Sequence, residues 1–176
     1  MERIDRITDS DFYGGEPVYM DHASRYASRG VLVNNDSNVA MMYMARHNLY
    51  KLPGGGIEAG ESAAEAFLRE VKEETGFESE IIHELGIIEE HKNRNQFMQR
   101  SYCFIAKTSG RSSSASLSES EHELGMSLRW MSIEEAIQEM SGAAANCKEY
   151  SFRFMLLRDG FILRRAAAML NDVGYR

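Results

Sequence analysis

The sequence predicts a single domain of the α/β class. Apolar runs with strand character lie on both sides of one strongly helical segment, and two more helical segments close the chain. The 176 residues, 43% of them hydrophobic, suffice for one well-buried core but leave little room for two. We therefore expect one domain over residues 1–176.

The first half of the chain alternates strand, turn and helix. Residues 26–34 and 39–46 are apolar and flank a polar turn, a pattern typical of a β-hairpin. Pro53 and three consecutive glycines predict a break in regular structure over residues 52–56. A helix is expected from Ser62 to Thr75, because the segment is rich in Ala, Glu and Leu and Gly76 follows it.

The remaining segments are predicted more simply. We expect strands at residues 80–90, 97–107 and 128–131, a helix beginning near Ser132, and a C-terminal helix over residues 151–172. Residues 109–120 are rich in serine and lack periodicity, which indicates a flexible loop. Residues 1–20 are expected to form an N-terminal arm over a neighbouring subunit or a short strand.

Charge and cysteine content limit the classes of function. A net charge of −7 argues against a large surface for nucleic acid polymers or anionic membranes, which clustered Lys and Arg usually bind. A phosphorylated ligand would therefore need a cation to help bind it. Cys103 and Cys147 lack disulfide or zinc spacing, and no apolar run is long enough to span a membrane. We expect a protein of the reducing cytoplasm.

The segment 55–77, GGIEAGESAAEAFLREVKEETGF, contains the chemistry. At about 100° per residue, Glu70, Glu73 and Glu74 fall within an arc of about 100° on one helix face. Such carboxylates repel one another unless a hard divalent cation, Mg²⁺ or Mn²⁺, lies among them. Arg69 is spaced to pair with Glu65 or Glu73. Gly54, Gly55 and Gly56, just before this helix, allow close approach of the backbone to a metal or phosphate.

This segment resembles the Nudix box, G-x5-E-x7-R-E-U-x-E-E-x-G-U with U apolar. Agreement at every specified position has a chance probability on the order of 10⁻⁹ for average composition. The matching residues are Gly55, Glu61, Arg69, Glu70, Val71, Glu73, Glu74, Gly76 and Phe77. The resemblance implies an α/β/α sandwich with a mixed β-sheet, in which the box forms a loop-helix-loop catalytic motif.

The resemblance also implies a set of site residues. The metal ligands would be the Gly55 carbonyl and the Glu70, Glu73 and Glu74 carboxylates, with Glu61 either a further ligand or a support for the loop. The general base would be Glu70 or an acidic residue beyond the box. That acidic cluster contains Glu119, Glu121, His122 and Glu123, of which we favour Glu121 or Glu123 because they follow the serine-rich loop.

The implied activity is hydrolysis of a phosphoanhydride bond in a nucleoside diphosphate linked to another moiety, such as a nucleoside triphosphate. Substrate contacts are weakly predicted at Arg29 and Lys51. The subtypes for ADP-ribose, dinucleoside polyphosphates and coenzyme A are disfavoured, because their accessory residues are missing around the box. Homodimerisation is expected by analogy.

Two other functions remain open at this stage. One is a Nudix-fold module that senses a nucleotide without cleaving it; such a module would tolerate loss of box carboxylates, yet all are present here. The other is isomerisation of an isoprenoid diphosphate on a similar fold. It requires a reactive cysteine with an acid, for which Cys103 is the candidate.

Overall fold

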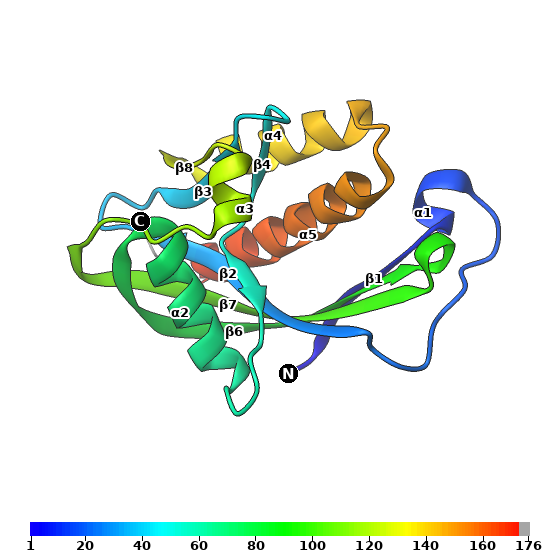
Figure 1. The fold of residues 1–176 in the computed structure, drawn as a ribbon, viewed down its shortest axis with the longest axis horizontal. Coiled ribbons are helices and arrows are strands. Elements are labelled where there is room, and N and C mark those ends of the chain that lie inside the picture. The colour runs from blue at the N-terminus through cyan, green and yellow to red at the C-terminus, as the bar shows by residue number, and fades with distance from the viewer. Residues whose placement is uncertain (173–176) are drawn as a thin grey trace.

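A mixed sheet of eight strands forms the centre of the structure, a computed structural model that describes residues 1–172 (Figure 1). The main path runs β1-β6-β7-β2-β3-β4, while β5 pairs with β2 and β8 with β3. Two pairs, β1 with β6 and β7 with β2, are parallel, and the others are antiparallel. The strands are β1 (Arg3–Thr8), β2 (Arg25–Val33), β3 (Val39–Met44), β4 (Leu49–Lys51), β5 (Gly54–Gly56), β6 (Phe77–Lys92), β7 (Phe97–Ser112) and β8 (Met126–Met131).

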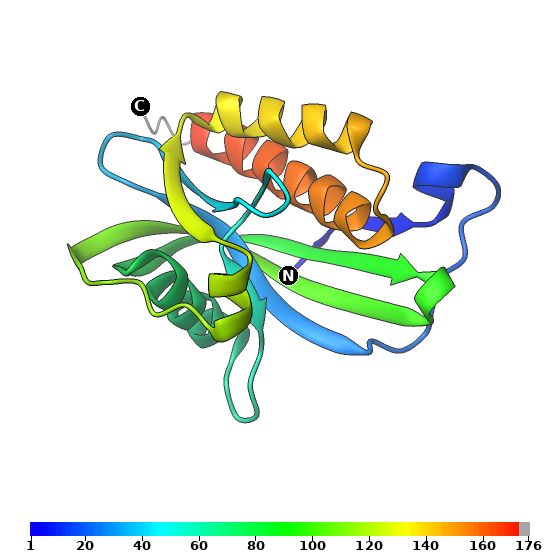
Figure 2. The same ribbon diagram turned by 45° about the horizontal axis from the view of Figure 1, so that its top comes forward.

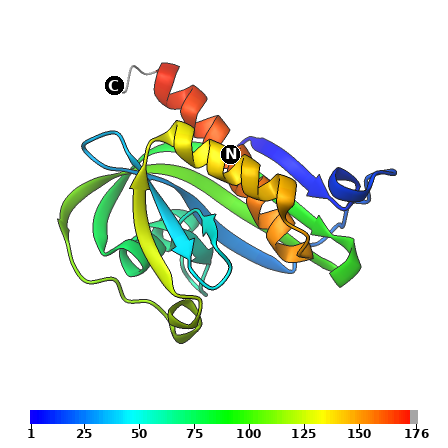
Figure 3. The ribbon, with the colours of Figure 1, turned by 90° about the horizontal axis from the view of Figure 1, so that it is seen from above.

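Helices cover both faces of this sheet. On one face lies α2 (Ala63–Thr75), and on the other α4 (Ile133–Asn146) and α5 (Tyr150–Asp172) lie side by side (Figures 2 and 3). The short helices are α1 (Ser10–Tyr13), η1 (Asn93–Asn95) and α3 (Glu119–Glu123). The expected α/β/α sandwich with a mixed sheet is thus confirmed.

The helix α2 begins and ends as its sequence predicts. The Ser62 hydroxyl accepts from the Glu65 backbone N–H, the Glu65 carboxylate accepts from the Ser62 N–H, and Gly76 ends the helix with φ 78°. Its apolar stripe, with Phe67 and Val71 fully buried, packs on the sheet residues Leu32, Ala40, Phe104 and Ala106. This packing orients the acidic face of α2 away from the core.

The opposite face of the sheet holds the larger core and a group of buried charges. Apolar side chains of α5 pack there with those of β2 and β7. Among them, the Arg158 guanidinium binds the Glu90 carboxylate at 3.0 Å and that of Asp159 at 2.7 Å. Asp159 also accepts a 2.8 Å hydrogen bond from the Leu52 backbone N–H. Polar contacts therefore attach α5 to both β6 and the segment before β5.

Several local predictions require correction. Residues 52–56 were expected to lack regular structure, but Gly54–Gly56 forms β5, paired antiparallel with Ala27, Ser28 and Arg29. The expected hairpin of residues 26–34 and 39–46 forms next to its turn, where Val33 pairs with Val39 and the Asn34 N–H donates to the Asn38 carbonyl. It is shorter than expected, because β5 pairs with residues 27–29 of β2. Residues 109–112 extend β7 rather than starting a loop, and residues 119–123 form α3.

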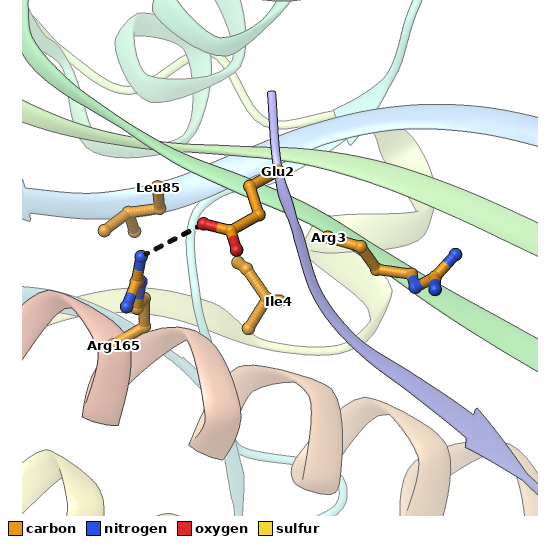
Figure 4. A pocket seen from close by; sticks show the side chains of 5 residues that line it. All are labelled: Glu2, Arg3, Ile4, Leu85 and Arg165. Carbon is orange, nitrogen blue, oxygen red and sulfur yellow. Dashed lines mark ion pairs between the residues drawn. The ribbon is translucent and has the colours of Figure 1, made fainter.

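The N-terminal segment completes one edge of the sheet. Arg3–Thr8 forms β1 beside β6, so the strand expected within residues 1–20 is present. Between β1 and α5 lies a small cavity of about 220 Å³, in which Arg165 reaches Glu2 at 3.8 Å (Figure 4). In the described part of the chain, no helix has both the length and the apolar character needed to cross a membrane.

The buried Glu90 carboxylate should contribute strongly to stability. Burial alone would raise its pKa, but the charges of Arg158, Lys92 and Arg29 outweigh burial and hold the pKa at about 2. We expect Glu90→Gln to lower the free energy of unfolding at pH 7 by about 3–5 kcal/mol, because it leaves buried cations uncompensated. Urea denaturation measures this loss.

The stability difference between parent and Glu90→Gln should depend on pH. Because the folded-state pKa lies below the ordinary 4.5, the contribution of Glu90 is complete above pH 4.5 and is lost as the pH falls towards 2. The difference between parent and variant should shrink over that range. Glu89→Gln, whose partners Arg6 and Arg100 are one-third exposed, should cost much less. Equal losses for the two variants would contradict the assignment.

Candidate active site

The glycine strand β5 lies directly against both β2 and α2. A side chain at Gly54, where φ is 138°, would collide with Arg29 and with the Ser28 carbonyl. A side chain at Gly55 would collide with the Glu70 carboxylate. Only glycine allows the backbone of β5 to lie between the strand and the acidic helix. The Gly55 backbone is therefore adjacent to the Glu70 carboxylate, as a shared metal site requires.

Arg69 links the loop before α2 to two box carboxylates. Its guanidinium donates to Glu61 at 2.8 and 3.1 Å, to Glu70 at 2.8 Å and to Glu73 at 3.1 Å. It also donates to the Gly56 carbonyl at 3.0 Å. Of the two predicted partners of Arg69, Glu73 is found, whereas Glu65 caps the helix instead. Hydrogen bonding from Arg69 lowers the pKa of Glu61, so this carboxylate supports the loop.

Glu74 is the most deeply buried of the box carboxylates, with 2% of the residue exposed. It accepts from the Lys51 ammonium at 2.6 Å and from the Gly54 N–H at 2.9 Å. Burial raises its pKa, and the Lys51 charge offsets this only in part. Glu73, in contrast, has a side chain that is 47% exposed and turned towards Arg69. The three carboxylates therefore differ sharply in environment, although one helix presents them all.

The segment after β7 brings a fourth carboxylate to the box. The Ser113 N–H donates to the Gly76 carbonyl at 2.6 Å, and the Ser116 N–H to the Glu73 carbonyl at 2.7 Å. These bonds attach the serine-rich segment to the end of α2 and place α3 beside it (Figure 2). Glu121 of α3 then lies close enough to Glu74 for each carboxylate to affect the pKa of the other. Glu119, His122 and Glu123 are exposed on the same short helix.

These elements surround a cavity of about 390 Å³ between the box and α5. Its lining includes Gly55, Glu70 and Glu121, together with the two weakly predicted contacts, Arg29 and Lys51. Sequence reasoning missed the other polar lining residues, Arg25, Lys92, Gln99, Ser151 and Arg158. One signal was available: the charged pair at residues 158–159 interrupts an apolar helix, which is typical of a buried polar contact.

The candidate Cys103 and two tyrosines of the sheet lie outside the lining of this cavity. Tyr102 lines a separate cavity of about 510 Å³ with Tyr26, beneath the loop that precedes α2. Tyr50 packs on Tyr43, at 5.0 Å between ring centroids. The Cys103 thiol is fully buried, and burial raises its pKa to about 12. A thiol held this firmly in its neutral form is a poor reactive group, which disfavours the isomerase alternative.

The donor set fits a divalent cation, although the side chains alone do not form a ready cage. Within residues 1–172, no three acidic, histidine or cysteine side chains are gathered as a metal centre. Two close pairs stand together instead: Gly55 with Glu70, and Glu74 with Glu121. Neighbouring carboxylates repel each other, and the single Lys51 ammonium at Glu74 balances only one of their charges. Oxygen donors of this kind suit Mg²⁺ or Mn²⁺.

The sequence of this chain is similar to those of known proteins. Residues 24–151 match the sequence model of the NUDIX domain. A putative 8-oxo-dGTP diphosphatase of Bacillus subtilis is 29% identical over 80 residues, 46% of this chain and 51% of that protein. Nucleoside diphosphate-linked moiety X motif 6 of Mus musculus is 27% identical over 135 residues, 77% of this chain and 40% of that protein. The chain thus spans about half or less of these relatives.

Solved structures share the fold. A NUDIX hydrolase from Nitrosomonas europaea superimposes with a TM-score of 0.54 at 24% identity, over 66% of this chain and 78% of that one. A MutT protein from Methanosarcina mazei gives 0.51 at 16% identity, over 68% and 85%. Since the domain match covers most of the chain and contains the glycine strand, the acidic helix and α3, this protein belongs to the Nudix hydrolase family.

Proposed function

We propose that this protein hydrolyses a phosphoanhydride bond in a small substrate, a nucleoside diphosphate linked to another moiety, with Mg²⁺ or Mn²⁺ as cofactor. The observation that supports it most directly is that Glu74, hydrogen-bonded to the Gly54 N–H, and Glu121 lie near Gly55 and Glu70 at a cation-lined cavity. The relatives' names, a diphosphatase and a nucleoside diphosphate-linked moiety X motif protein, agree with this class of substrate.

Each box residue receives a role from its surroundings. The Gly55 carbonyl, Glu70 and Glu74 would hold the cation, with Glu73 on the outer side next to Glu70. When bound, the cation would neutralise phosphate charge and make a coordinated water more acidic. Arg69 holds Glu70 in place through its 2.8 Å bond, and Lys51 is positioned to contact a phosphate once Glu74 binds metal.

The general base is best assigned to Glu121. Attack of a water oxygen at phosphorus breaks the bond between that phosphorus and the bridging oxygen, and the water must lose a proton. Glu121 lines the cavity and belongs to a short helix on a tethered segment. Glu123 is exposed and does not line the cavity, while the Glu70 carboxylate already accepts from Arg69. These differences favour Glu121 over both.

The proposal includes a reducing cellular compartment and a homodimer. Both cysteines are free thiols, which fits a reducing compartment such as the cytoplasm. The exposed Tyr13, Val18 and Tyr19 follow β1 in the chain and offer an apolar surface for a homodimer contact.

Substitutions of the three box carboxylates should lower kcat to different degrees. We expect Glu70→Gln and Glu74→Gln to lower kcat about 100-fold or more, because each removes a ligand beside the reacting phosphate. Glu73→Gln should cost less, since its side chain is half exposed and bound to Arg69. Release of phosphate or pyrophosphate from nucleoside triphosphates, nucleotide sugars and dinucleotides measures this. Glu78→Gln, an exposed partner of Lys72, is the matched control.

The base assignment has its own test. Glu121→Gln should lower kcat on the best substrate by about 10²-fold or more, the usual contribution of a general base. Glu123→Gln, on the same short helix, should retain parental kcat because its side chain does not line the cavity. Steady-state kinetics at saturating Mg²⁺ measure both. The reverse order of losses would transfer the role to Glu123.

Metal binding can be measured without turnover. Mg²⁺ or Mn²⁺ at millimolar concentration should raise the melting temperature of the parent protein, because the ion binds the folded state alone. This rise should disappear in Glu74→Gln, and EDTA should abolish hydrolysis. No thermal shift with either ion would refute the metal role. Tight binding of a nucleotide without any hydrolysis would instead support the sensing module.

A further inference from the structure

On the side of β2, β6 and α5, the cavity beside the box is lined by the cations Arg25, Arg29, Lys92 and Arg158. We call this side the inner half of the cavity and the side next to α2 and α3 the outer half. Arg25 and Arg29 come from β2, where a separation of four residues places both side chains on the same sheet face. Gln99 of β7 lies opposite Arg25 in the parallel register. Lys92 enters from β6, and Arg158 enters from α5. Two strands and one helix therefore direct basic groups at a single space, and the strand between them adds the neutral Gln99 amide.

Two of these cations are already compensated. Arg158 binds Glu90 and Asp159 at 3.0 and 2.7 Å, and Lys92 approaches Glu90 at 3.2 Å. Glu90 also accepts from the Gln99 amide at 2.9 Å. The two buried carboxylates thus form their direct ion pairs with Arg158 and Lys92, and they act on Arg29 only without ion-pair contact.

The two β2 arginines lack such a partner. In the part of the chain that the structure describes, neither Arg25 nor Arg29 has a carboxylate within ion-pair distance. Arg29 is 5% exposed, and its only hydrogen bond there is a 3.3 Å contact with the Ser101 hydroxyl. Burial, and then the neighbouring Arg158 charge, lower its pKa to about 10. A buried guanidinium in this state is unfavourable unless an anion joins it.

The charges that act most strongly on Arg29 differ from those that act most strongly on Glu74. The charges that act on Arg29 belong to Arg158, Asp159 and Glu90, all on the α5 side of the sheet. The charged groups that act on Glu74 are Lys51 and Glu121. A cation held by the box would thus attract one phosphate group at the outer half, whereas the inner half attracts another anion by itself.

We propose that the inner half of the cavity, lined by Arg25, Arg29, Lys92 and Arg158, binds a second phosphate group of the substrate, separate from the phosphoanhydride that is cleaved. This proposal rests on the proposed function for the identity of the reaction. Guanidinium groups bind phosphate oxygens in pairs. The cavity has one aromatic lining residue, Phe152, so it is poorly built to stack a neutral base.

Matched substrates that differ by a phosphate test this directly. The pairs are NADH with NADPH, dephospho-coenzyme A with coenzyme A, and GDP with guanosine 3′,5′-bis(diphosphate). In at least one pair, we expect kcat/KM to be 10-fold or more higher for the member with the additional phosphate. Arg29→Gln and Arg25→Gln should bring this ratio close to one. Ratios of one or below in all three pairs for the parent protein would overturn the proposal.

The control variant removes a cation elsewhere on α5. Arg165 lies in the small cavity beside β1, half exposed and next to Glu2 (Figure 4). Arg165→Gln changes the net charge by the same amount as Arg29→Gln, but it should leave the substrate ratio unchanged. An equal effect of the two variants would mean that the protein's overall charge, not this cavity, sets the preference.

A metal-free measurement separates this proposal from hydrolysis. In EDTA, inorganic pyrophosphate should bind the parent protein in calorimetry and should bind Arg29→Gln at least 10-fold more weakly. If the proposed hydrolysis is wrong, pyrophosphate should still bind. If the proposed anion site is wrong, the protein should still hydrolyse simple nucleotides. Pyrophosphate binding with unchanged substrate ratios would indicate a site for a free anion and would also contradict the proposal.

Folding of the variants is checked in the same samples. Without phosphate, Arg29→Gln should melt at or above the parental temperature, because it removes a buried charge that has no ion-pair partner. A lower melting temperature would show that Arg29 is satisfied inside the protein and needs no ligand. Arg25→Gln, at an exposed position, keeps the kinetic test valid if Arg29→Gln does not fold.

Discussion

The close contact of the glycine strand with two neighbours is the constraint on which the site depends. Because Gly54 and Gly55 have no side chains, their backbone lies against β2 on one side and against the Glu70 carboxylate on the other. The same approach lets the Gly54 N–H reach Glu74, which is buried as a result. A side chain at Gly54 would collide with the backbone of β2, and a side chain at Gly55 would displace the Glu70 carboxylate.

Charge is divided between the two halves of that cavity. Carboxylates of α2 and α3 meet at the outer half, where a divalent cation would balance them. Arginines and Lys92 line the inner half, around two buried carboxylates that are already paired. An acidic protein with a net charge of −7 thereby presents a basic interior surface to an acidic ligand. Net charge sums all the charged groups of the chain and says little about those that line one cavity.

Helix ends are predicted correctly from the sequence, whereas two strand segments are not. The capping residues Ser62 and Ser132 and the stop at Gly76 act through neighbours within a few positions, so both helix starts and the helix end agree with expectation. The segment 52–56 was mispredicted because glycines and proline usually interrupt strands, yet here a neighbouring strand supplies all the pairing. The same reason explains the extension of β7 along β6 through residues that resemble a loop.

The sequence alone determined the α/β class, the family and the acidic helix, because each depends on residues close together in the chain. Only the tertiary structure decided which carboxylates share the cavity, since Glu121 comes from a segment held against α2 by backbone bonds that no composition reveals. The tertiary structure also brings the Arg29 guanidinium near that of Arg158, 129 positions later in the chain, while no carboxylate lies within ion-pair distance of Arg29 in the described residues. Electrostatic environments of this kind depend on distance and burial in space, and neither is encoded by local periodicity.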